Sequence, residues 1–529
     1  MELNLQNIRE ARSKLKGCDI VNFRSDGESF VYFISKLEVI DFRHIKNLVI
    51  DFKHPVTVIA GSNKIGKTSL LILLACSHEK FIKIDATSPK RELREHVWND
   101  VIGFTAHESE TKDYSYKITW RVGTAAAKTG EGKRLASSKA WTGLGKKSSA
   151  KDRLNAKIRD REVRMIDLER MLPARSFSDT LYRKANNSTK VRLKPEIEKA
   201  FCYIFNLVGA EIYEVGSHVN KSCFIIKSNG YEYSSYNAAS GEEAMIYLLI
   251  DMFAAPKNSL ILVDEIEAGF HPAVQRKIAN VIQYISWIEK KQFVITTHSP
   301  TFLSSFPGQS RVFIEAGAAS YKAISGVSRH AAASKMDSLA HPLITLYCED
   351  DIAAFLIRKV IQGIGCSDDH FSRLYQIIKS GPVDQVKNDY VRHKRNFPQL
   401  QNKIGYAAVF DGDYKDHPLY SNYFNNSSEE VCFLYPFEAP EKFLVRSFLR
   451  LKPNPELQSA LAHTDHHSLF QEMVNLGLAA DIGDARGRCY DAFEKASEYS
   501  KHKLDLTEFL VLLAEKFSEM TIDSDELFV

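Results

Sequence analysis

The sequence predicts an α/β fold, with two successive α/β regions followed by a helical C-terminal part. Short apolar runs that are typical of buried strands alternate with helix-like segments along most of the chain. A glycine-rich turn joins one such strand to a helix, and later strands end at carboxylates. With 529 residues, 44% of them hydrophobic, the chain is long enough for two or three packed domains.

The glycine-rich turn Gly61-Ser62-Asn63-Lys64-Ile65-Gly66-Lys67-Thr68 matches the phosphate-binding pattern GxxxxGK followed by Ser or Thr. A β-rich run, 56–60, precedes it, and a helix-like run, 68–75, follows it. Glycines let backbone amides curl around phosphate oxygens, and the helix N-terminus adds a partial positive charge. We expect Lys67 to reach the β- and γ-phosphates of ATP and Thr68 to ligate Mg²⁺. The residues expected to hold the nucleotide here are Gly61, Asn63, Gly66, Lys67, Thr68 and Ser69.

Two further strands end at residues suited to hydrolysis. The apolar run 259–263 is typical of a strand covered on both faces, and it ends at Asp264 and Glu265. We expect Asp264 to join the Mg²⁺ shell and Glu265 to act as the base that orients the attacking water. The run 293–297 ends at His298, which we expect to contact the γ-phosphate. A lone loop histidine is usually structural, but its position after Asp264 and Glu265 favours the functional interpretation.

Together with Ser240-Gly241-Glu242, these motifs resemble the split cassette of the ABC-type ATPases of the OLD (overcoming lysogenization defect) family. Residues 264–272 are similar to the Walker B motif and D-loop of that family. Ser240-Gly241-Glu242-Glu243 is similar to its shortened signature, which the SMC class shares. The resemblance covers about residues 30–310. It implies that Ser240 and Gly241 of one subunit meet the γ-phosphate held by another, so that ATP joins the chains of a homodimer or larger homo-oligomer.

Two features depart from the family pattern. No glutamine of a Q-loop can be placed, and Lys64 stands in the phosphate-binding turn where glycine or alanine is common. Both departures bear on nucleotide affinity and turnover.

The motif positions and changes in composition divide the chain into five parts. They are an N-terminal extension (1–30) with a helix over residues 7–15, an ABC-type ATPase domain split into 31–122 and 194–315, a basic, partly helical insertion (123–193), a second α/β domain (340–450) and a helical C-terminal region (451–529). Within the insertion we expect a helix over residues 150–170. Lys and Arg outnumber Asp and Glu between residues 128 and 164, which fits either contact with nucleic-acid phosphates or a solvated helix face.

The second α/β domain contains two strands that each end in acids. The run 343–348 ends at Glu349, and the run 407–410 ends at Asp411-Gly412-Asp413. Because the carboxyl ends of parallel strands meet at one sheet edge, three carboxylates could gather there and hold one or two Mg²⁺ ions for phosphodiester cleavage. This region resembles a TOPRIM domain, the nuclease part fused to the cassette in OLD proteins. The resemblance matches Glu349 to the TOPRIM glutamate and Asp411 and Asp413 to the DxD pair, and Glu438 lies in a further OLD-like segment.

The TOPRIM match has two departures, Asp350 in place of glycine and Ala353 in place of an acid. Because losing a carboxylate weakens metal binding, the sequence favours a TOPRIM-like scaffold without its chemistry, with an active nuclease as the alternative. This combination resembles the ATPases of Septu-type anti-phage systems, including those carried by retrons, in which a separate HNH nuclease cuts. The stretch 60–68, running into 75–78, is also similar to that subgroup.

The sequence therefore predicts an ATP-binding and ATP-hydrolysing ABC-type enzyme that controls a nuclease, a separate HNH partner, in anti-phage defence. The alternative is an OLD-type, ATP-regulated, metal-dependent DNA endonuclease that uses Glu349, Asp411 and Asp413. The expected cofactors are ATP and Mg²⁺. The expected partners are further copies of the chain, the HNH nuclease and a nucleic acid, either DNA or the RNA and DNA of a retron.

Composition sets further expectations. The net charge is only +4, so a nucleic-acid surface would have to be a local patch. No run of eighteen apolar residues predicts a membrane span, and the N-terminal residues lack a signal-peptide pattern. The eight cysteines are scattered without a CxxC motif, as in proteins with reduced thiols, so we expect a cytoplasmic protein. The cluster His463-Thr464-Asp465-His466-His467 is interpreted as a polar helix start rather than a metal site.

Overall fold

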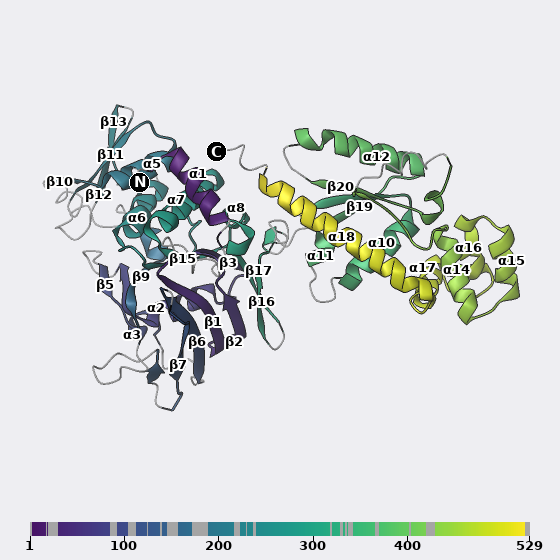
Figure 1. Cartoon of the computed structure of the whole chain (residues 1–529), viewed down its shortest axis with the longest axis horizontal. Coiled ribbons are helices and arrows are strands. Elements are labelled where there is room, and N and C mark those ends of the chain that lie inside the picture. The colour runs from purple at the N-terminus through teal and green to yellow at the C-terminus, as the bar shows by residue number, and fades with distance from the viewer. Residues whose placement is uncertain are drawn as a thin grey trace. The chain divides into compact units, whose positions relative to one another are not determined.

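The computed structural model divides into two compact units, residues 1–332 and 333–529, which are described separately (Figure 1). It describes residues 3–16, 18, 30–84, 93–103, 113–123, 125–137, 140–144, 157–171, 189–215, 223–228, 230–235, 240–317, 320–327, 332–333, 336, 342–364, 370–400, 404–418 and 429–523. Within these residues, no helix is both long and apolar enough to cross a membrane.

The first unit is built on an eight-stranded sheet with the strand order β17-β16-β3-β15-β14-β9-β4-β5. The six inner strands run parallel to one another, and the two edge strands, β17 and β5, are antiparallel to their neighbours. In chain order the strands are β3 (Val56–Gly61), β4 (His78–Ile84), β5 (Leu93–Glu95), β9 (Ile158–Ile166), β14 (Leu260–Val263), β15 (Gln292–Thr297), β16 (Arg311–Ala316) and β17 (Tyr321–Ser325).

Continuous apolar runs explain why the centre of this sheet is buried. Every residue of β3, β14 and β15 is buried, as expected for strands covered on both faces. The helices of this unit are α1 (Leu5–Lys16), α2 (Lys67–Cys76), α3 (Trp98–Val101), α5 (Pro195–Phe205), α6 (Ser240–Ala254), α7 (Pro272–Glu289) and α8 (Pro300–Ser304), with short 3-10 turns η2 (Leu168–Met171) and η4 (Gly308–Ser310). The helix predicted over residues 7–15 is confirmed as α1, which packs on α7.

Two antiparallel sheets complete the first unit. One has the order β2-β1-β6-β7-β8, and the other has the order β10-β11-β12-β13. Their strands are β1 (Tyr32–Phe42), β2 (Ile45–Asp51), β6 (Tyr114–Val122), β7 (Lys128–Arg134), β8 (Trp141–Gly143), β10 (Lys190–Arg192), β11 (Ala210–Val215), β12 (Cys223–Ser228) and β13 (Tyr231–Ser234). Trp141 of β8 stacks on Trp98 with ring centroids 3.8 Å apart, so this part of the chain belongs to a packed core.

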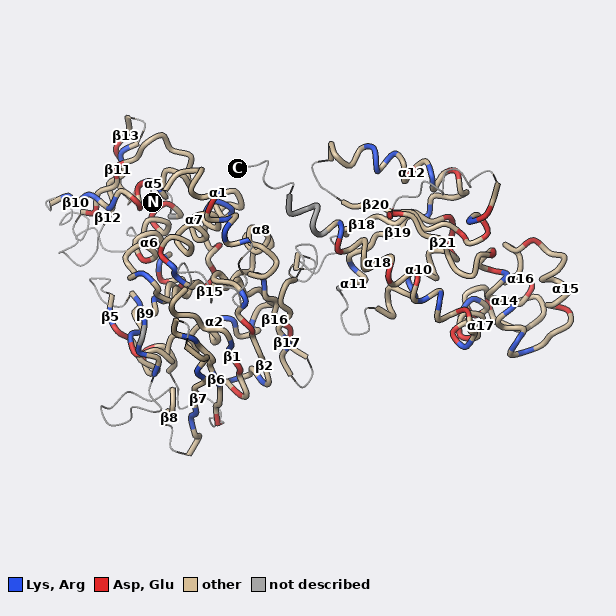
Figure 2. The backbone as a smooth tube through the Cα atoms, viewed as in Figure 1, with Lys and Arg blue, Asp and Glu red and all other residues tan. Residues whose placement is uncertain are grey.

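The expectation of a partly helical insertion at 123–193 is wrong in its described part. Residues 158–166, expected to lie in a helix over 150–170, form β9, which lies between β14 and β4 in the main sheet. Two arginines of this strand are buried and bonded: Arg161 donates to Gln292 Oε1 at 3.0 Å, and Arg164 donates to Glu162 at 2.6 Å. The charge run misled the prediction because these two arginines are buried inside the fold and not on a solvated helix face. In Figure 2, Lys and Arg lie among Asp and Glu in both units.

The second unit contains a four-stranded parallel sheet with the order β19-β18-β20-β21. Its strands are β18 (Ile344–Cys348), β19 (Tyr375–Lys379), β20 (Gly405–Phe410) and β21 (Val431–Phe433). Its helices are α10 (Asp351–Ile364), α11 (His370–Arg373), α12 (Val383–Asn396), α14 (Pro440–Leu451), α15 (Pro455–His463), α16 (Leu469–Asn475), α17 (Ile482–Phe493) and α18 (Ser497–Asp523), with 3-10 turns η6 (Phe397–Gln399), η7 (Gly412–Tyr414) and η8 (His466–Ser468). The predicted α/β class and the helical C-terminal part are confirmed.

Candidate functional site

Four loops meet at the carboxyl edge of the main sheet of the first unit. They follow the neighbouring parallel strands β3, β15, β14 and β9. In open α/β sheets this edge is where ligands bind. The loops carry the glycine-rich turn, His298, the Asp264-Glu265 pair and Arg170, respectively.

The glycine-rich turn has the backbone geometry that its sequence predicts. Gly66 begins α2 at a φ of 96°, and a side chain there would meet Ile45 at 2.6 Å. Gly61 has no room either, because a Cβ atom would lie 2.8 Å from the carbonyl oxygen of Ile314. Lys64 is left-handed, with a φ of 63°, although it is not glycine. Its strain explains why glycine is the easier residue at this position.

The Lys67 ammonium group lies over the turn. Its Nζ donates to the carbonyl oxygens of Gly61 at 2.9 Å and Ser62 at 3.1 Å. Burial lowers the pKa of Lys67 to about 8, while the nearby carboxylates, of which Glu265 contributes most, oppose the shift. An anionic phosphate beside this amine would favour its charged form. Of the other residues predicted to hold nucleotide, Asn63 and Thr68 are exposed and Ser69 is buried in α2.

Asp264 is tied to two hydroxyl groups. Its Oδ2 accepts from Thr68 Oγ1 at 2.8 Å, and its Oδ1 accepts from Thr296 Oγ1 at 2.5 Å. The two residues predicted to share Mg²⁺, Thr68 and Asp264, are thus in direct contact. A carboxylate and a hydroxyl are the hard oxygen ligands that Mg²⁺ prefers, so this pair fits the ion.

Glu265 and His298 face each other beside this pair. The distance between His298 Nε2 and Glu265 Oε1 is 3.8 Å, and both side chains are partly exposed. Glu265 has a φ of 44°, and its N–H donates to Thr296 Oγ1 at 2.9 Å. Glu267 accepts hydrogen bonds from the Thr297 hydroxyl at 2.7 Å and from the His298 N–H. The positions of both predicted catalytic side chains are therefore set by neighbouring backbone and hydroxyl contacts.

Arg170 is a site residue that the sequence interpretation missed. This buried side chain donates from one terminal nitrogen to the carbonyl oxygen of Asp264 at 3.0 Å and from the other to that of Glu265 at 2.7 Å. It fixes the backbone that carries both acids. No sequence motif predicted Arg170 as a site residue, because residues 158–171 were assigned to an insertion. Thr296 and Glu267 were also missed, although both lie next to motif residues.

The signature segment begins α6. A Cβ atom on Gly241 would lie 3.0 Å from the carbonyl oxygen of Gly269, so the start of α6 lies against the loop that follows Glu265. Glu242 accepts a hydrogen bond from the Tyr233 hydroxyl at 3.1 Å. The side chain of Ser240 lies outside the described residues.

A second group of acids lies in the C-terminal unit. Glu349 follows β18 and Asp411 follows the adjacent β20, and the Asp411 N–H donates to Glu349 Oε1 at 3.4 Å. Burial raises the pKa of Glu349 to about 7 and that of Asp411 well above its ordinary value. Asp413 is exposed nearby and adds to both shifts. The structure thus brings the three predicted carboxylates to one sheet edge.

The residues that depart from the TOPRIM pattern have structural roles. Asp350 Oδ1 accepts from the N–H groups of Ile352 at 2.8 Å and Ala353 at 2.9 Å, so it caps the start of α10. Glu438 is paired with Arg446 at 2.6 Å. The acid that approaches the group is instead Glu441, which is buried and contributes to the raised pKa of Asp411.

Comparison with known proteins agrees with the geometry of the first unit. Residues 56–304, a little under half of the 529-residue chain, match a family model described as "AAA domain, putative AbiEii toxin, Type IV TA system". No curated protein matches the chain.

Several solved structures are similar over about half of this chain. The SMC head domain from Thermotoga maritima is 11% identical, with 55% of this chain and 98% of that chain covered and a TM-score of 0.33. The Smc head domain derived from Pyrococcus furiosus, bound to the C-terminal domain of ScpA, is 12% identical, with coverages of 56% and 96% and a TM-score of 0.35. The recombination mediator protein RecF is 13% identical, with coverages of 56% and 98% and a TM-score of 0.32.

The glycine-rich turn, the bonded Thr68–Asp264 pair and the match over residues 56–304 point to one kind of domain. Residues 56–304 are similar to a P-loop AAA domain, which implies ATP as the ligand.

Proposed function

We propose that this chain hydrolyses ATP at the edge of its main sheet and uses the cycle to control a nuclease in anti-phage defence. The observation that carries the proposal is the chain of contacts from Thr68 through Asp264 to Thr296, with Glu265 and His298 beside it. These contacts support the proposal that a phosphate-binding turn, an Mg²⁺ pair and a base lie at one edge.

Each residue then has a definite task. Lys67 and the amides of the turn bind the β- and γ-phosphates, and Thr68 and Asp264 hold Mg²⁺, which would neutralise charge on those phosphates. Glu265 takes the proton of the water whose oxygen bonds to the γ-phosphorus, while the bond from that phosphorus to the bridging oxygen breaks and ADP leaves. His298 donates to the γ-phosphate, and Arg170 keeps the Asp264-Glu265 backbone in place.

The site is completed by a second copy of the chain. Ser240 and Gly241 of that copy would contact the γ-phosphate, as the resemblance to OLD-family cassettes implies. The packing of Gly241 against Gly269 supports this arrangement, because a shift in the loop after Glu265 would displace the start of α6. ATP binding would therefore close a head-to-tail dimer, and hydrolysis would open it.

The controlled nuclease is a separate HNH protein in this proposal. Support comes from the resemblance to Septu-type ATPases and from the toxin description of the family model that matches residues 56–304. Asp350 in place of glycine and Ala353 in place of an acid point the same way, because each serves α10 rather than a metal. DNA, or the RNA and DNA of a retron, would be the nucleic acid of the complex.

A second candidate function is DNA cleavage by the chain itself. The observation that favours it is the contact between Asp411 and Glu349 at the end of adjacent parallel strands. Asp411 Oδ1 is buried and has no hydrogen-bond partner among the described residues, so it is an acceptor available to a cation. The second candidate would use Mg²⁺ or Mn²⁺ at Glu349, Asp411 and Asp413.

One experiment separates the two candidates. The purified chain is incubated with plasmid and linear DNA in Mg²⁺ or Mn²⁺, with and without ATP, beside Asp411→Asn and Glu265→Gln. ATP turnover without DNA cleavage supports the partner nuclease. Cleavage by the parent chain that disappears in Asp411→Asn establishes the second candidate instead. Absence of ATP turnover in the parent chain contradicts the first candidate.

A further inference from the structure

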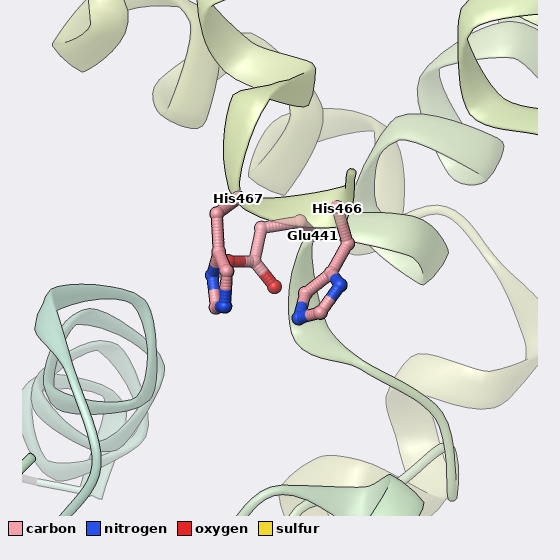
Figure 3. A group of neighbouring side chains, drawn as sticks. All are labelled: Glu441, His466 and His467. Carbon is pink, nitrogen blue, oxygen red and sulfur yellow. The ribbon is translucent and has the colours of Figure 1, made fainter. Parts of the chain in front are cut away.

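Three side chains of the C-terminal unit converge outside the acids already described. Glu441 lies in the first turn of α14, and His466 and His467 lie in η8. One ligand atom of each residue lies within 4.8 Å of those of the other two. Figure 3 shows the two imidazole rings on either side of the Glu441 carboxylate. We call these residues the Glu441 cluster.

Asp465 lies at the start of η8, as expected for a polar helix start, but its side chain makes no capping hydrogen bond there. His467 Nδ1 instead lies 3.2 Å from Glu441 Oε1, and the rings of His466 and His467 have centroids 4.0 Å apart. Two adjacent histidines thus lie beside one carboxylate, which sequence spacing alone did not predict.

The Glu441 cluster combines one buried carboxylate with two exposed imidazole rings. The Glu441 side chain is 3% exposed, whereas those of His466 and His467 are 32% and 64% exposed. A buried carboxylate supplies a charge that does not move, and the exposed rings give an ion an entry path from solvent. Asp465 lies 3.2 Å from His466 Nδ1. Such a contact holds the proton on Nδ1 and leaves the lone pair of Nε2 available to an ion.

A second observation points to a cation at this place. Asp411 is partly buried, and its buried Oδ1 has no hydrogen-bond partner among the described residues. Glu441 raises the pKa of Asp411, and His467 acts in the opposite direction on the pKa of Glu349. The Glu441 cluster therefore lies close enough to Asp411 and Glu349 to influence their pKa values.

We propose that Glu441, His466 and His467 form a binding site for a first-row transition-metal dication, such as Zn²⁺ or Mn²⁺. Two imidazole nitrogens and one carboxylate oxygen are the donors that such ions accept, whereas Mg²⁺ prefers oxygen alone. Three protein ligands leave coordination positions open for water or a phosphate oxygen. Ligands bonded at about 2.0–2.1 Å to a tetrahedral ion lie about 3.4 Å apart, so the exposed rings need to rotate inward by roughly 1 Å.

This inference goes beyond both candidate functions, because metal binding by the cluster is measured without ATP turnover or DNA cleavage. It differs from the predicted Mg²⁺ site in its donors. A cation bound by the Glu441 cluster would be a second metal position, in addition to the one predicted at Glu349, Asp411 and Asp413.

The test uses the full chain after removal of metals with a chelator. Co²⁺ is added and its visible absorption is recorded, and Zn²⁺ binding is measured by calorimetry. The variants are His466→Ala, His467→Ala and Glu441→Gln. His463→Ala is the matched control, because His463 belongs to the same segment but not to the cluster. Asp411→Asn separates the cluster from the neighbouring acids, and circular dichroism in chelator checks the fold of each variant.

We expect one Co²⁺ per chain with a spectrum of imidazole ligation in the parent chain, in His463→Ala and in Asp411→Asn. Zn²⁺ affinity should fall in each cluster variant by more than the roughly 10–100-fold that loss of an outer-shell partner costs. The proposal is overturned if the parent chain binds neither ion, or if folded cluster variants bind them as the parent does. It is also overturned if only Asp411→Asn loses Co²⁺.

Discussion

The carboxyl edge of the main sheet in the first unit, which carries Asp264 and Glu265, is called the ATPase edge. The carboxyl edge of the sheet in the second unit, which carries Glu349 and Asp411, is called the acidic edge. The two edges occupy the same place in their sheets but differ in how their carboxylates are stabilised. Asp264 accepts hydrogen bonds from two hydroxyl groups, and Arg170 holds the backbone of Asp264 and Glu265. At the acidic edge, Glu349 and Asp411 are partly buried with Glu441 nearby, and both have raised pKa values.

The two edges therefore differ in whether their geometry is fixed before a ligand binds. Directed hydrogen bonds fix the geometry of the ATPase edge, so little reorganisation is needed when phosphate binds. The acidic edge holds like charges in a poorly solvated place, and a bound cation or protons would relieve their repulsion. Mutations should therefore cost activity at the first edge and change stability or metal dependence at the second.

The largest effect is expected from Asp264→Ala. This change removes the proposed Mg²⁺ ligand and the shared acceptor of Thr68 and Thr296, so we expect turnover of ATP to fall by about 10²–10³-fold, the range of lost charge stabilisation. Phosphate release measures it. Glu196→Gln, an exposed change on α5, is the control and should match the parent chain. Turnover within a few-fold of the parent in Asp264→Ala would remove Asp264 from the site.

A smaller loss is expected from Arg170→Lys. Lysine keeps the charge but cannot bridge two carbonyl oxygens with a planar fork. A lost charged hydrogen bond is worth about 1.5–3 kcal/mol, so kcat should fall roughly ten- to a hundred-fold. Since Arg170 acts through the backbone of the acids, KM for ATP should change little. A rise in KM with an unchanged kcat would instead place Arg170 on the nucleotide.

The acidic edge should show its charge in the pH dependence of unfolding. The pKa of Glu349 rises from its ordinary value of 4.5 to about 7 on folding. The folded chain therefore binds a proton more tightly, so this contribution to stability is present below about pH 4.5 and is lost as pH rises towards 7. In chelator, the C-terminal unit should lose on the order of 2–3 kcal/mol over this window.

Chemical denaturation of the parent chain and of Glu349→Gln between pH 4.5 and 7.5 measures the effect. The variant should show a flatter profile, and Mn²⁺ should restore stability to the parent chain at pH 7.5. Identical profiles for the two chains would mean that Glu349 is not held in an unfavourable charged state.

The smallest effect is expected from Lys64→Gly. Lys64 is left-handed, and this conformation costs a non-glycine residue about 1–2 kcal/mol, part of which glycine gives back through its larger unfolded-state entropy. We expect the ATPase unit to gain about 0.5–1 kcal/mol of stability. Ser62→Gly, in the same turn but without a positive φ, should not be stabilised. A loss of stability in Lys64→Gly would show that the lysine side chain contributes more than its strain costs.

Much of the ATPase edge was predictable because its chemistry lies in short local motifs. The glycine-rich turn, Asp264, Glu265 and His298 each follow an apolar strand, and parallel pairing brings strand ends together. The role of Thr296 was hidden because it depends on the register of β14 and β15, in which Val263 pairs with Ile295.

The parts that were missed depend on contacts between residues far apart in the sequence. The charged strand β9 lies inside the main sheet, between β14 and β4, and its Arg161 donates to Gln292, which lies 131 positions later. Arg170 was missed for a related reason, because it follows β9 in the segment that was assigned to the insertion. Glu441 lies three residues after Glu438, which was noted from the sequence. Its contact with His466 and His467 depends on how α14 and η8 pack. Such packing has no local sequence signal.

The most direct test of the account is ATP binding and ATP turnover by Glu265→Gln. Glutamine keeps the size and the backbone contacts of Glu265 but cannot accept a proton, and general-base loss typically costs 10²–10⁴-fold. We expect ATP binding equal to that of the parent chain, turnover lower by about that factor and an accumulated ATP-bound dimer in sedimentation. Hydrolysis by Glu265→Gln at the rate of the parent chain would contradict the proposed role of Glu265.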